Sequence, residues 1–229
     1  MNHDEHIKTI GLIGSGNIGG TVAKLAVAAG FRVVLSNSRG PETLAGLSAE
    51  LGPLAQAATP QAAAQAGDLV LLTVPLRAVT QIDPKPLAGK IVIDTNNYYP
   101  DRDGRIAEVD QGLPTSQYVQ RHLVGAKVVK AFNNIFFKHL QKLGQKAGDA
   151  ERCALPMAGD DPESKAVVAW FLDKLGYDAV DAGGLAESWR FERDRPAYGV
   201  VYSGSGGAFY TDPGAPASVE KIKQALKSA

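Results

Sequence analysis

The chain has 229 residues, 45% of them hydrophobic, which is enough for one large domain with a packed core. Basic and acidic residues balance at 24 each, so no strong positive field points to nucleic acid or to an anionic membrane surface. A single cysteine, Cys153, excludes an internal disulfide framework, and no apolar run approaches the roughly 18 residues that a membrane helix needs. With a polar start in place of an apolar leader, these features predict a cytoplasmic protein.

The most informative stretch is residues 7–20, IKTIGLIGSGNIGG, where a short apolar run leads into glycines and then into a helical pattern. Gly14 allows a tight turn after the first strand, Gly16 lets the backbone approach a pyrophosphate, and Gly19 lets the helix lie close to the sheet. The phosphates would lie at the helix N-terminus, where free N–H groups and the helix dipole favour anions. Because a strand and a helix flank the glycines, the stretch predicts a dinucleotide site and not merely a turn.

The second predicted strand, residues 31–35, decides which dinucleotide is expected. It runs into SNSRG at 36–40, which contains no carboxylate to bind the ribose hydroxyls of NAD. Ser38 can donate a hydroxyl to a 2′-phosphate, and Arg39 can form a charge-assisted, bidentate pair with it. We therefore expect NADP(H). The alternative for Arg39 is a solvated side chain in an ordinary turn.

Further along the chain, continuous apolar runs alternate with helical patterns. Strands are expected at residues 7–13, 32–35, 69–74, 90–94, 127–132, 154–158 and 178–181. Helices are expected at residues 17–29, 41–51, 60–66, 115–122, 136–145 and 162–175. Continuous apolar runs indicate strands that are covered on both faces, and the alternation indicates parallel crossovers. The sequence thus predicts an α/β protein with a Rossmann-type, doubly wound, mostly parallel sheet.

The character of the sequence changes after Ala182. We divide the chain into an NADP-binding Rossmann domain, 1–182, and a small C-terminal segment, 183–229, with helices expected at 185–193 and 217–226. This tail would complete an acceptor pocket or a dimer interface. A homodimer is expected because the apolar face of the last helix has little of its own domain to cover it.

In a doubly wound sheet, ligands lie across the carboxyl ends of the strands. Val74 and Pro75 follow the third predicted strand and would form an apolar wall beside the ribose. Asn96, Asn133 and Asn134 follow the fourth and fifth strands, and their amides offer the donors and acceptors that match a nicotinamide carboxamide. Asparagine after a strand is also an ordinary turn former, so each of the three could be only that.

The residues that are absent from the strand ends are also informative. None of these ends carries a histidine or lysine as a ready proton donor, and the sequence has no Ser/His/Asp order and no metal-ligand cluster. His122 and His139 lie within helical patterns and are expected at the surface or in packing, and Cys153 opens an apolar run and is expected in the core. We therefore predict no catalytic side chain and no metal. Such a site suits hydride transfer between two cofactors, because the receiving ring carries the chemistry and the protein orients the rings.

A more specific signal comes from segments GSGNIGG (14–20), Ser38-Arg39, LLTVP (71–75), VVKAFN (128–133), GDDPESK (159–165) and DAGGLAES (181–188). Together they resemble the NADPH-dependent reductases of the 8-hydroxy-5-deazaflavin coenzyme, the coenzyme F-420:NADP oxidoreductases. The resemblance implies that the pyrophosphate and ribose are held by Ser15, Gly16, Asn17 and Ile18. It also implies that Ser38 and Arg39 hold the 2′-phosphate. Ala131 would lie by the nicotinamide, with the deazaflavin in an adjoining pocket that faces the tail.

A second likeness lies at residues 96–100, NNYYP, which resemble the NADPH-binding reductase domains of membrane metalloreductases. Those domains pass hydride to a flavin. The predicted function is therefore an NADP(H)-dependent oxidoreductase that transfers a hydride between NADPH and a deazaflavin or flavin ring. Phe132, Ile135 and Trp189 would shape the acceptor pocket, although each could equally be a core residue.

Two other functions remain open. The enzymatic alternative reduces a small carbonyl or imine substrate with Tyr98, Tyr99 or Lys130 as the acid. The other is a non-catalytic NADPH-sensing module whose tail docks a partner protein. Tight NADPH binding without turnover would be its signature.

Overall fold

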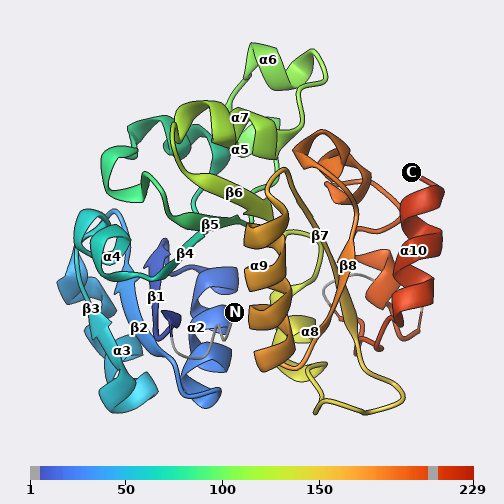
Figure 1. Ribbon diagram of the computed structural model, residues 1–229, viewed down its shortest axis with the longest axis horizontal. Helices are drawn as coiled ribbons and strands as arrows, with labels where there is room; N and C mark the ends of the chain where they lie inside the picture. The colour runs from blue at the N-terminus through green and yellow to red at the C-terminus, as the bar shows by residue number, and fades with distance from the viewer. Residues whose placement is uncertain (1–5, 206–210) are drawn as a thin grey trace.

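The computed structural model describes residues 6–205 and 211–229. Residues 1–5, on which the expectation of a polar start rests, and 206–210 lie outside the described part. Within that part, eight strands form one sheet in the order β3-β2-β1-β4-β5-β6-β7-β8, which runs across the molecule in Figure 1. All neighbouring strands are parallel except β6 and β7, which pair antiparallel. The predicted doubly wound, mostly parallel sheet is confirmed.

The strands are β1 Thr9–Ile13, β2 Arg32–Ser36, β3 Ala55–Ala57, β4 Leu69–Leu72, β5 Ile91–Asp94, β6 Lys127–Lys130, β7 Ala154–Gly159 and β8 Asp178–Asp181. The helices are α2 Asn17–Ala28, α3 Ala45–Leu51, α4 Pro60–Ala66, α5 Pro100–Asp103, α6 Ala107–Asp110, α7 Thr115–His122, α8 Phe137–Lys142, α9 Pro162–Lys174 and α10 Val219–Lys227. Short 3₁₀ helices occupy Pro41–Leu44, Gly52–Leu54, Leu76–Gln81, Lys85–Leu87, Leu185–Phe191 and Val200–Tyr202.

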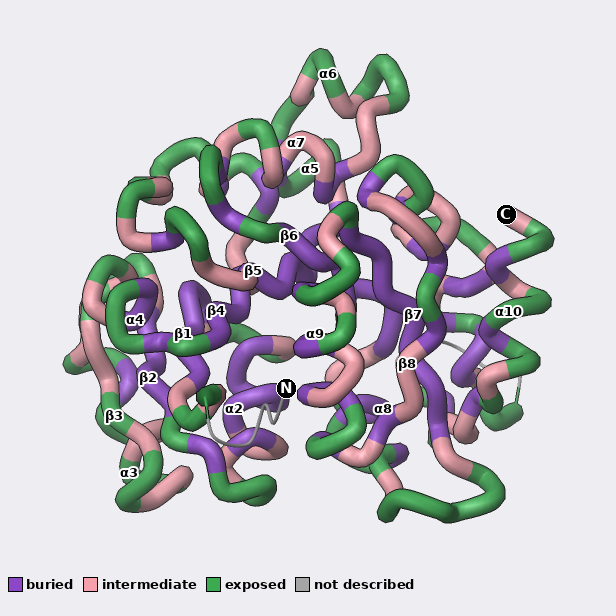
Figure 2. Tube along the Cα trace, viewed as in Figure 1, coloured by how far each residue is buried: buried purple, intermediate pink, exposed green. Residues whose placement is uncertain are grey.

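Alternating side chains of the strands build two hydrophobic clusters, one on each face of the sheet. In β4, Leu69 and Leu71 enter the cluster that contains residues of α2 and α9, whereas Val70 and Leu72 enter the cluster that contains residues of α4 and α7. Both faces of the central strands are therefore shielded from solvent, and Figure 2 shows the buried residues along these strands. This burial explains why the strands appear in the sequence as continuous apolar runs. Cys153 lies in the first cluster, and burial raises the pKa of its thiol to about 11, as expected for an inert core cysteine.

Several elements differ from the sequence-based expectation. The alanine-rich edge strand β3 was not predicted, because alanine favours helices and a strand of three residues has no periodicity to detect. The helix expected at 41–51 is divided into a 3₁₀ turn and α3, and the one expected at 185–193 is a 3₁₀ helix that ends at Phe191. Asp161 caps α9 by accepting from the Ser164 amide at 3.1 Å, in agreement with the helix start predicted there.

The tail is packed into the main core. Phe191 and Tyr202 are fully buried in the same cluster as the strands, and Tyr202 donates its hydroxyl to the Ala154 carbonyl of β7 at 3.0 Å. Ile222 and Leu226 of α10 are buried in this cluster too, so the chain itself covers the face from which a homodimer was expected. None of the described helices has the length and apolar character to cross a bilayer.

Candidate functional site

The close packing of the loop between β1 and α2 depends on glycines, because a Cβ atom at Gly14 or Gly19 would clash with neighbouring backbone. Gly14 has φ 101°, and a Cβ placed on it would lie 2.3 Å from the carbonyl oxygen of Thr73. A Cβ on Gly19 would lie 2.4 Å from the carbonyl oxygen of Gly14, so α2 begins in close contact with the loop. Gly16, in contrast, faces open space, and no side chain caps the first turn of α2. The helix N-terminus is thus available to an anion, as the sequence pattern predicts.

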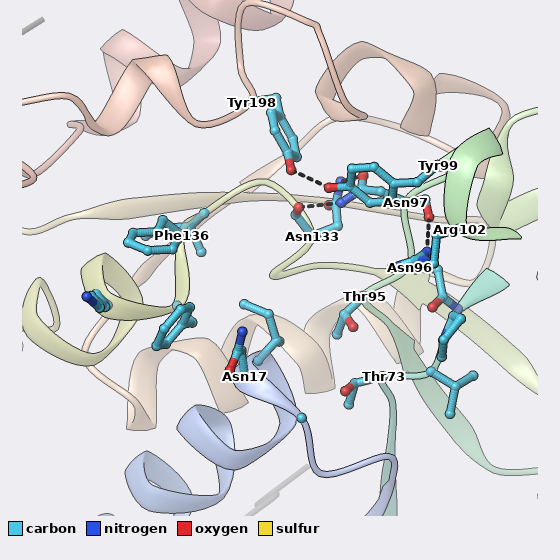
Figure 3. Close-up of a pocket in the computed structure, with 17 residues that line it drawn as sticks. Asn17, Thr73, Thr95, Asn96, Asn97, Tyr99, Arg102, Asn133, Phe136 and Tyr198 are labelled. Atoms are coloured by element: carbon cyan, nitrogen blue, oxygen red, sulfur yellow. Dashed lines mark hydrogen bonds between the residues drawn. The ribbon is translucent and has the colours of Figure 1, made fainter. Parts of the chain in front are cut away.

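A cavity of about 670 Å³ lies next to this loop, at the carboxyl ends of the strands (Figure 3). It is lined by Gly16, Asn17, Ile18, Thr73, Val74, Pro75, Thr95, Asn96, Asn97, Tyr99, Arg102, Asn133, Ile135, Phe136, Phe137, Lys138 and Tyr198. The apolar and aromatic side chains among these residues form part of the wall, and the amides gather near the ends of β5 and β6. We call this space the main cavity.

Two buried asparagines line the main cavity, and each has one side-chain atom without a hydrogen-bond partner in the described chain. Asn133 is 5% exposed, and its Nδ2 donates to Asn97 Oδ1 at 3.1 Å and to the Phe191 carbonyl at 2.9 Å, which leaves its Oδ1 without a partner in the described part of the chain. Asn96 is 3% exposed, and its Nδ2 likewise has no partner there. A buried polar atom left unpaired costs about 1–3 kcal/mol. One free donor and one free acceptor therefore fit a ligand that offers the reverse pair, as a primary carboxamide does.

The turn after β6 holds an unusual backbone conformation. Phe132 has φ 62°, which is rare for a bulky side chain and costs of order 1–3 kcal/mol. Its ring is fully buried and meets Phe171 of α9 edge-on, with 6.4 Å between the ring centroids. Of the two roles that the sequence left open for Phe132, the structure gives it the core role, and Phe132 does not line the main cavity. Its strained backbone lies directly before Asn133.

Beneath the amides lies a buried group of charges. Lys130 is fully buried, and its Nζ donates to the Asn96 carbonyl at 2.7 Å and to Thr115 Oγ1 at 2.8 Å. Asp94 accepts a hydrogen bond from the backbone N–H of Asn96 at 3.0 Å, and its carboxylate lies 3.9 Å from Lys130 Nζ. The carboxylate of Glu192, in the tail, lies 3.7 Å from the same Nζ atom. Burial raises the pKa of Asp94, while Lys130 acts in the opposite direction. The backbone of Asn96 is therefore held on both its amide and its carbonyl side.

A second cavity of about 440 Å³ lies on the other side of the glycine loop. It is lined by Ile13, Gly14, Asn37, Ser38, Thr59, Pro60, Gln61, Ala64, Val74, Ala78, Gln81, Ile82, Asp83 and Pro86. Because Val74 borders both cavities, the two meet at the end of β4, where a dinucleotide would bridge them. Arg39 does not line this cavity; its side chain is exposed and makes no hydrogen bond or ion pair with the rest of the described chain.

The structure brings most of the predicted binding residues together. The main cavity contains Gly16, Asn17, Ile18, Val74, Pro75, Asn96 and Asn133, and the second contains Gly14, Ser38 and Val74. Ser15 lines neither, and its hydroxyl is used by the fold, donating to the Ser36 carbonyl at 3.0 Å. Ala131 is fully buried behind the cavity wall. Asn134 holds the tail, with its Nδ2 donating to the Ala197 carbonyl at 2.7 Å.

The three candidate acids have different surroundings. Lys130 is committed to the buried charges below the cavity. The Tyr98 hydroxyl donates to the Gly104 carbonyl at 3.0 Å and accepts from the Ile106 amide at 3.0 Å, away from the main cavity. Tyr99 is the one of the three that lines the cavity. His122 and His139 do not line it, in agreement with the packing role expected for them.

Sequence reasoning missed several residues that line the main cavity. Tyr198 lies in the tail, about 100 positions from its hydrogen-bond partner Tyr99, and no local pattern marks it. Phe136 and Phe137 were assigned to the start of a helix and not to a pocket wall. Asn97 enters the sequence analysis only within the NNYYP segment, and its role in orienting the Asn133 amide emerges once β5 and β6 are placed side by side.

The chain is similar to known proteins in both sequence and fold. The sequence model of the family described as NADP oxidoreductase coenzyme F420-dependent matches residues 9–98. A hypothetical protein from Sinorhizobium meliloti is 30% identical; the match covers 86% of this chain and 95% of that one, with a TM-score of 0.71. This chain belongs to the same family as that protein.

Two further relatives cover less or are more distant. Metalloreductase STEAP3 of Rattus norvegicus is 29% identical over 185 residues, which are 80% of this chain and 35% of the rat protein. The chain thus spans about a third of the length of that relative. A proposed F420-dependent NADP reductase from Arthrobacter sp. FB24 is 24% identical, with a TM-score of 0.65 over 80% of this chain and 87% of that one, and it shares the fold.

The glycine loop of this protein yields a paired prediction. Gly19→Ala should destabilise the protein by about 2 kcal/mol or more, because the new Cβ meets backbone. Gly16→Ala should change the unfolding free energy by no more than about 1 kcal/mol, since the added Cβ would have no neighbouring atom within 4 Å. The same Cβ should weaken NADPH binding at least about tenfold, because it occupies the space through which the backbone approaches the pyrophosphate. Denaturant unfolding and calorimetric titration measure the two effects. NADPH binding by Gly16→Ala at wild-type affinity would contradict the pyrophosphate assignment.

Proposed function

We propose that the protein transfers a hydride between NADPH and a planar deazaflavin or flavin ring in the main cavity. The observation that carries the proposal is that Asn96 and Asn133 both line one cavity, and that the Asn96 Nδ2 and the Asn133 Oδ1 are buried without a partner in the described chain. A nicotinamide carboxamide would satisfy both atoms. NADPH, when bound, would supply the hydride, and the residues of the chain would hold and orient the two rings.

The size and walls of the main cavity favour a flat ring as the acceptor. Its volume of about 670 Å³ lies within the ordinary range for small-molecule and cofactor sites. Ile18 and Ile135 provide aliphatic surface, and Phe136 and Phe137 lie edge-on to one another with centroids 4.8 Å apart. Such surfaces bind planar aromatic rings well. The family description names a deazaflavin coenzyme, and STEAP3 is named as a metalloreductase, so both support redox chemistry of this kind.

The tail contributes to this site in our proposal. Tyr198 comes from 183–229 and lines the main cavity, and the Phe191 carbonyl holds the Asn133 amide. We therefore propose that the tail completes the acceptor pocket. The homodimer and the cytoplasmic location stay predictions of the sequence.

The second cavity supports NADP(H) over NAD(H). Ser38 lines it at the carboxyl end of β2, and the exposed Arg39 follows with a side chain that makes no hydrogen bond or ion pair in the described chain. Among the residues that line this cavity, Asp83 is the carboxylate, and it lies on the turn after β4 and not at the end of β2. No carboxylate therefore lines the position after β2 that would repel a 2′-phosphate.

Arg39→Ala should weaken NADPH binding about tenfold while leaving NADH binding nearly unchanged, because a charge-assisted hydrogen bond to phosphate contributes about 1.5–3 kcal/mol. The matched control is Arg32→Ala, which removes an exposed arginine from the opposite end of the same strand. Calorimetric titration with both nucleotides gives the four affinities. Equal losses for NADPH and NADH in Arg39→Ala would remove Arg39 from the phosphate site.

Steady-state oxidation of NADPH tests the proposed reaction. Riboflavin or the deazaflavin should support turnover at least about tenfold faster than simple aldehydes and imines, because the aromatic walls bind flat rings. Turnover with carbonyl compounds alone would show the reductase of a small substrate, a function favoured by the Tyr99 hydroxyl in the cavity. Tight NADPH binding with no turnover on any acceptor would show a nucleotide sensor.

A further inference from the structure

Hydride transfer to an uncharged acceptor leaves a negative charge on it, and a nearby proton donor would neutralise that charge. Most polar side chains that line the main cavity are already engaged elsewhere. Thr95 donates its hydroxyl to the Leu72 carbonyl at 3.2 Å, and Arg102 binds Asp103 and the Asn97 carbonyl. Lys138 is exposed, with its Nζ 6.0 Å from the Phe136 ring centroid. The hydroxyls of Thr73, Tyr99 and Tyr198 also line the cavity, and of these the tyrosine phenols are stronger acids than the threonine alcohol.

Tyr99 and Tyr198 point toward one another in Figure 3, and their hydroxyl oxygens are 2.7 Å apart. Either hydroxyl can be the donor of this bond. If Tyr198 donates to Tyr99, the proton of Tyr99 is free to point into the main cavity, which both residues line. In this arrangement the hydrogen bonds run from Tyr198 to Tyr99 and from Tyr99 to a bound acceptor, which is the direction that a proton relay needs.

The position of Tyr99 is fixed by charged neighbours. Its backbone amide donates to Asp103 Oδ2 at 3.0 Å, and its ring contacts the guanidinium groups of Arg102, 4.7 Å from the ring centroid, and Arg193, 5.0 Å from it. Such cation–π contacts hold an aromatic ring in place. They also place positive charge near the ring that becomes a phenolate when the proton leaves. Arg193 and Tyr198 belong to the tail, so this arrangement depends on the folded tail.

Tyr198 links the main cavity to a route for solvent. Together with Tyr99 and Arg102 it also lines an adjoining groove of about 980 Å³, whose other lining residues are Asp101, Arg193, Asp194, Arg195, Pro196 and Val200. Five of these six are exposed. Water in this groove can therefore reach Tyr198 and replace a proton that the pair has given up.

We infer that Tyr99 is the proton donor of the acceptor site and that Tyr198 returns the proton from the groove; this rests on the hydride transfer proposed above. The hydride pair leaves the nicotinamide and forms a new bond to the acceptor. The O–H bond of Tyr99 breaks as its proton passes to the acceptor atom that has become negative. Tyr198 gives its proton to Tyr99 and takes one from water. The sum is NADPH, acceptor and one solvent proton in, and NADP⁺ and the doubly reduced acceptor out.

Two ring acceptors of similar shape separate proton transfer from hydride transfer. Riboflavin is uncharged and becomes negative when it receives a hydride, whereas N-methylacridinium is a cation and becomes neutral with no proton. The variants are Tyr99→Phe and, as the matched control, Tyr98→Phe, which removes a neighbouring hydroxyl that faces away from the cavity. NADPH affinity by calorimetry and riboflavin affinity by fluorescence quenching show whether the site stays intact.

Tyr99→Phe should lower kcat with riboflavin about 100-fold, the ordinary size of a general-acid contribution, and should leave turnover of N-methylacridinium and both affinities within about twofold. Tyr198→Phe should cause a smaller loss with riboflavin, because groove water can replace it. Tyr98→Phe should keep both activities. The wild-type rate with riboflavin should fall in deuterated water, and Tyr99→Phe should lose this isotope effect.

Three results would overturn the inference while leaving hydride transfer standing. Full riboflavin turnover in Tyr99→Phe would show that the hydroxyl gives no proton. An equal loss with both acceptors would show that it only positions the rings. Loss of riboflavin turnover in Lys138→Met, with Tyr99→Phe active, would assign the proton to the lysine. If the wild-type protein reduced neither acceptor, the proposed hydride transfer would fail, and this inference with it.

Discussion

The buried ammonium group of Lys130 connects β6 to the end of β5, to α7 and to the tail. It bonds the Asn96 carbonyl beyond β5 and Thr115 of α7, and it lies within 4 Å of Asp94 and of Glu192 in the tail. The Lys130 and Asp94 side chains are fully buried and the Glu192 side chain is 18% exposed, so desolvation offsets most of the attraction and the group gives little net stability. Removing one partner costs far more, about 3–5 kcal/mol, because the others stay buried and unpaired. This group of charges therefore favours the one arrangement of the strand ends and the tail in which all its members are paired, over arrangements that leave one of them unpaired.

This arrangement explains why a cavity with two unsatisfied amides can persist. Asn96 is held by Lys130 and Asp94 through its backbone, and Asn133 is held by Asn97 and the Phe191 carbonyl through its side chain. The strained backbone of Phe132 is retained because its ring is fixed in the core. Strain and unpaired polar atoms at one point in a well-packed fold are typical of a site that is prepared for a ligand. The tail takes part through Phe191, Glu192 and Tyr198, so the cavity and the tail form one unit.

Much of the fold and part of the site follow from local sequence, and the remainder depends on contacts between distant residues. The glycine loop, the parallel strands and the polar residues at the strand ends each leave a short-range pattern, and all were predicted. Strand β3 leaves none, and the antiparallel pairing of β7 depends on its neighbours in the sheet. From the sequence Lys130 is only a candidate acid, and its place in a buried group of charges emerges once its partners at positions 94, 115 and 192 are brought together. Tyr198 joins the cavity only because the tail folds back across it.

The central claim is that the nicotinamide carboxamide lies between Asn96 and Asn133, and a crystal structure of the protein with NADP⁺ tests it most directly. The account predicts that the carboxamide oxygen accepts from Asn96 Nδ2 and that its nitrogen donates to Asn133 Oδ1, each at about 3 Å. One face of the ring should remain open to the main cavity. A carboxamide bound elsewhere, with both asparagine atoms still unpaired, would contradict the account.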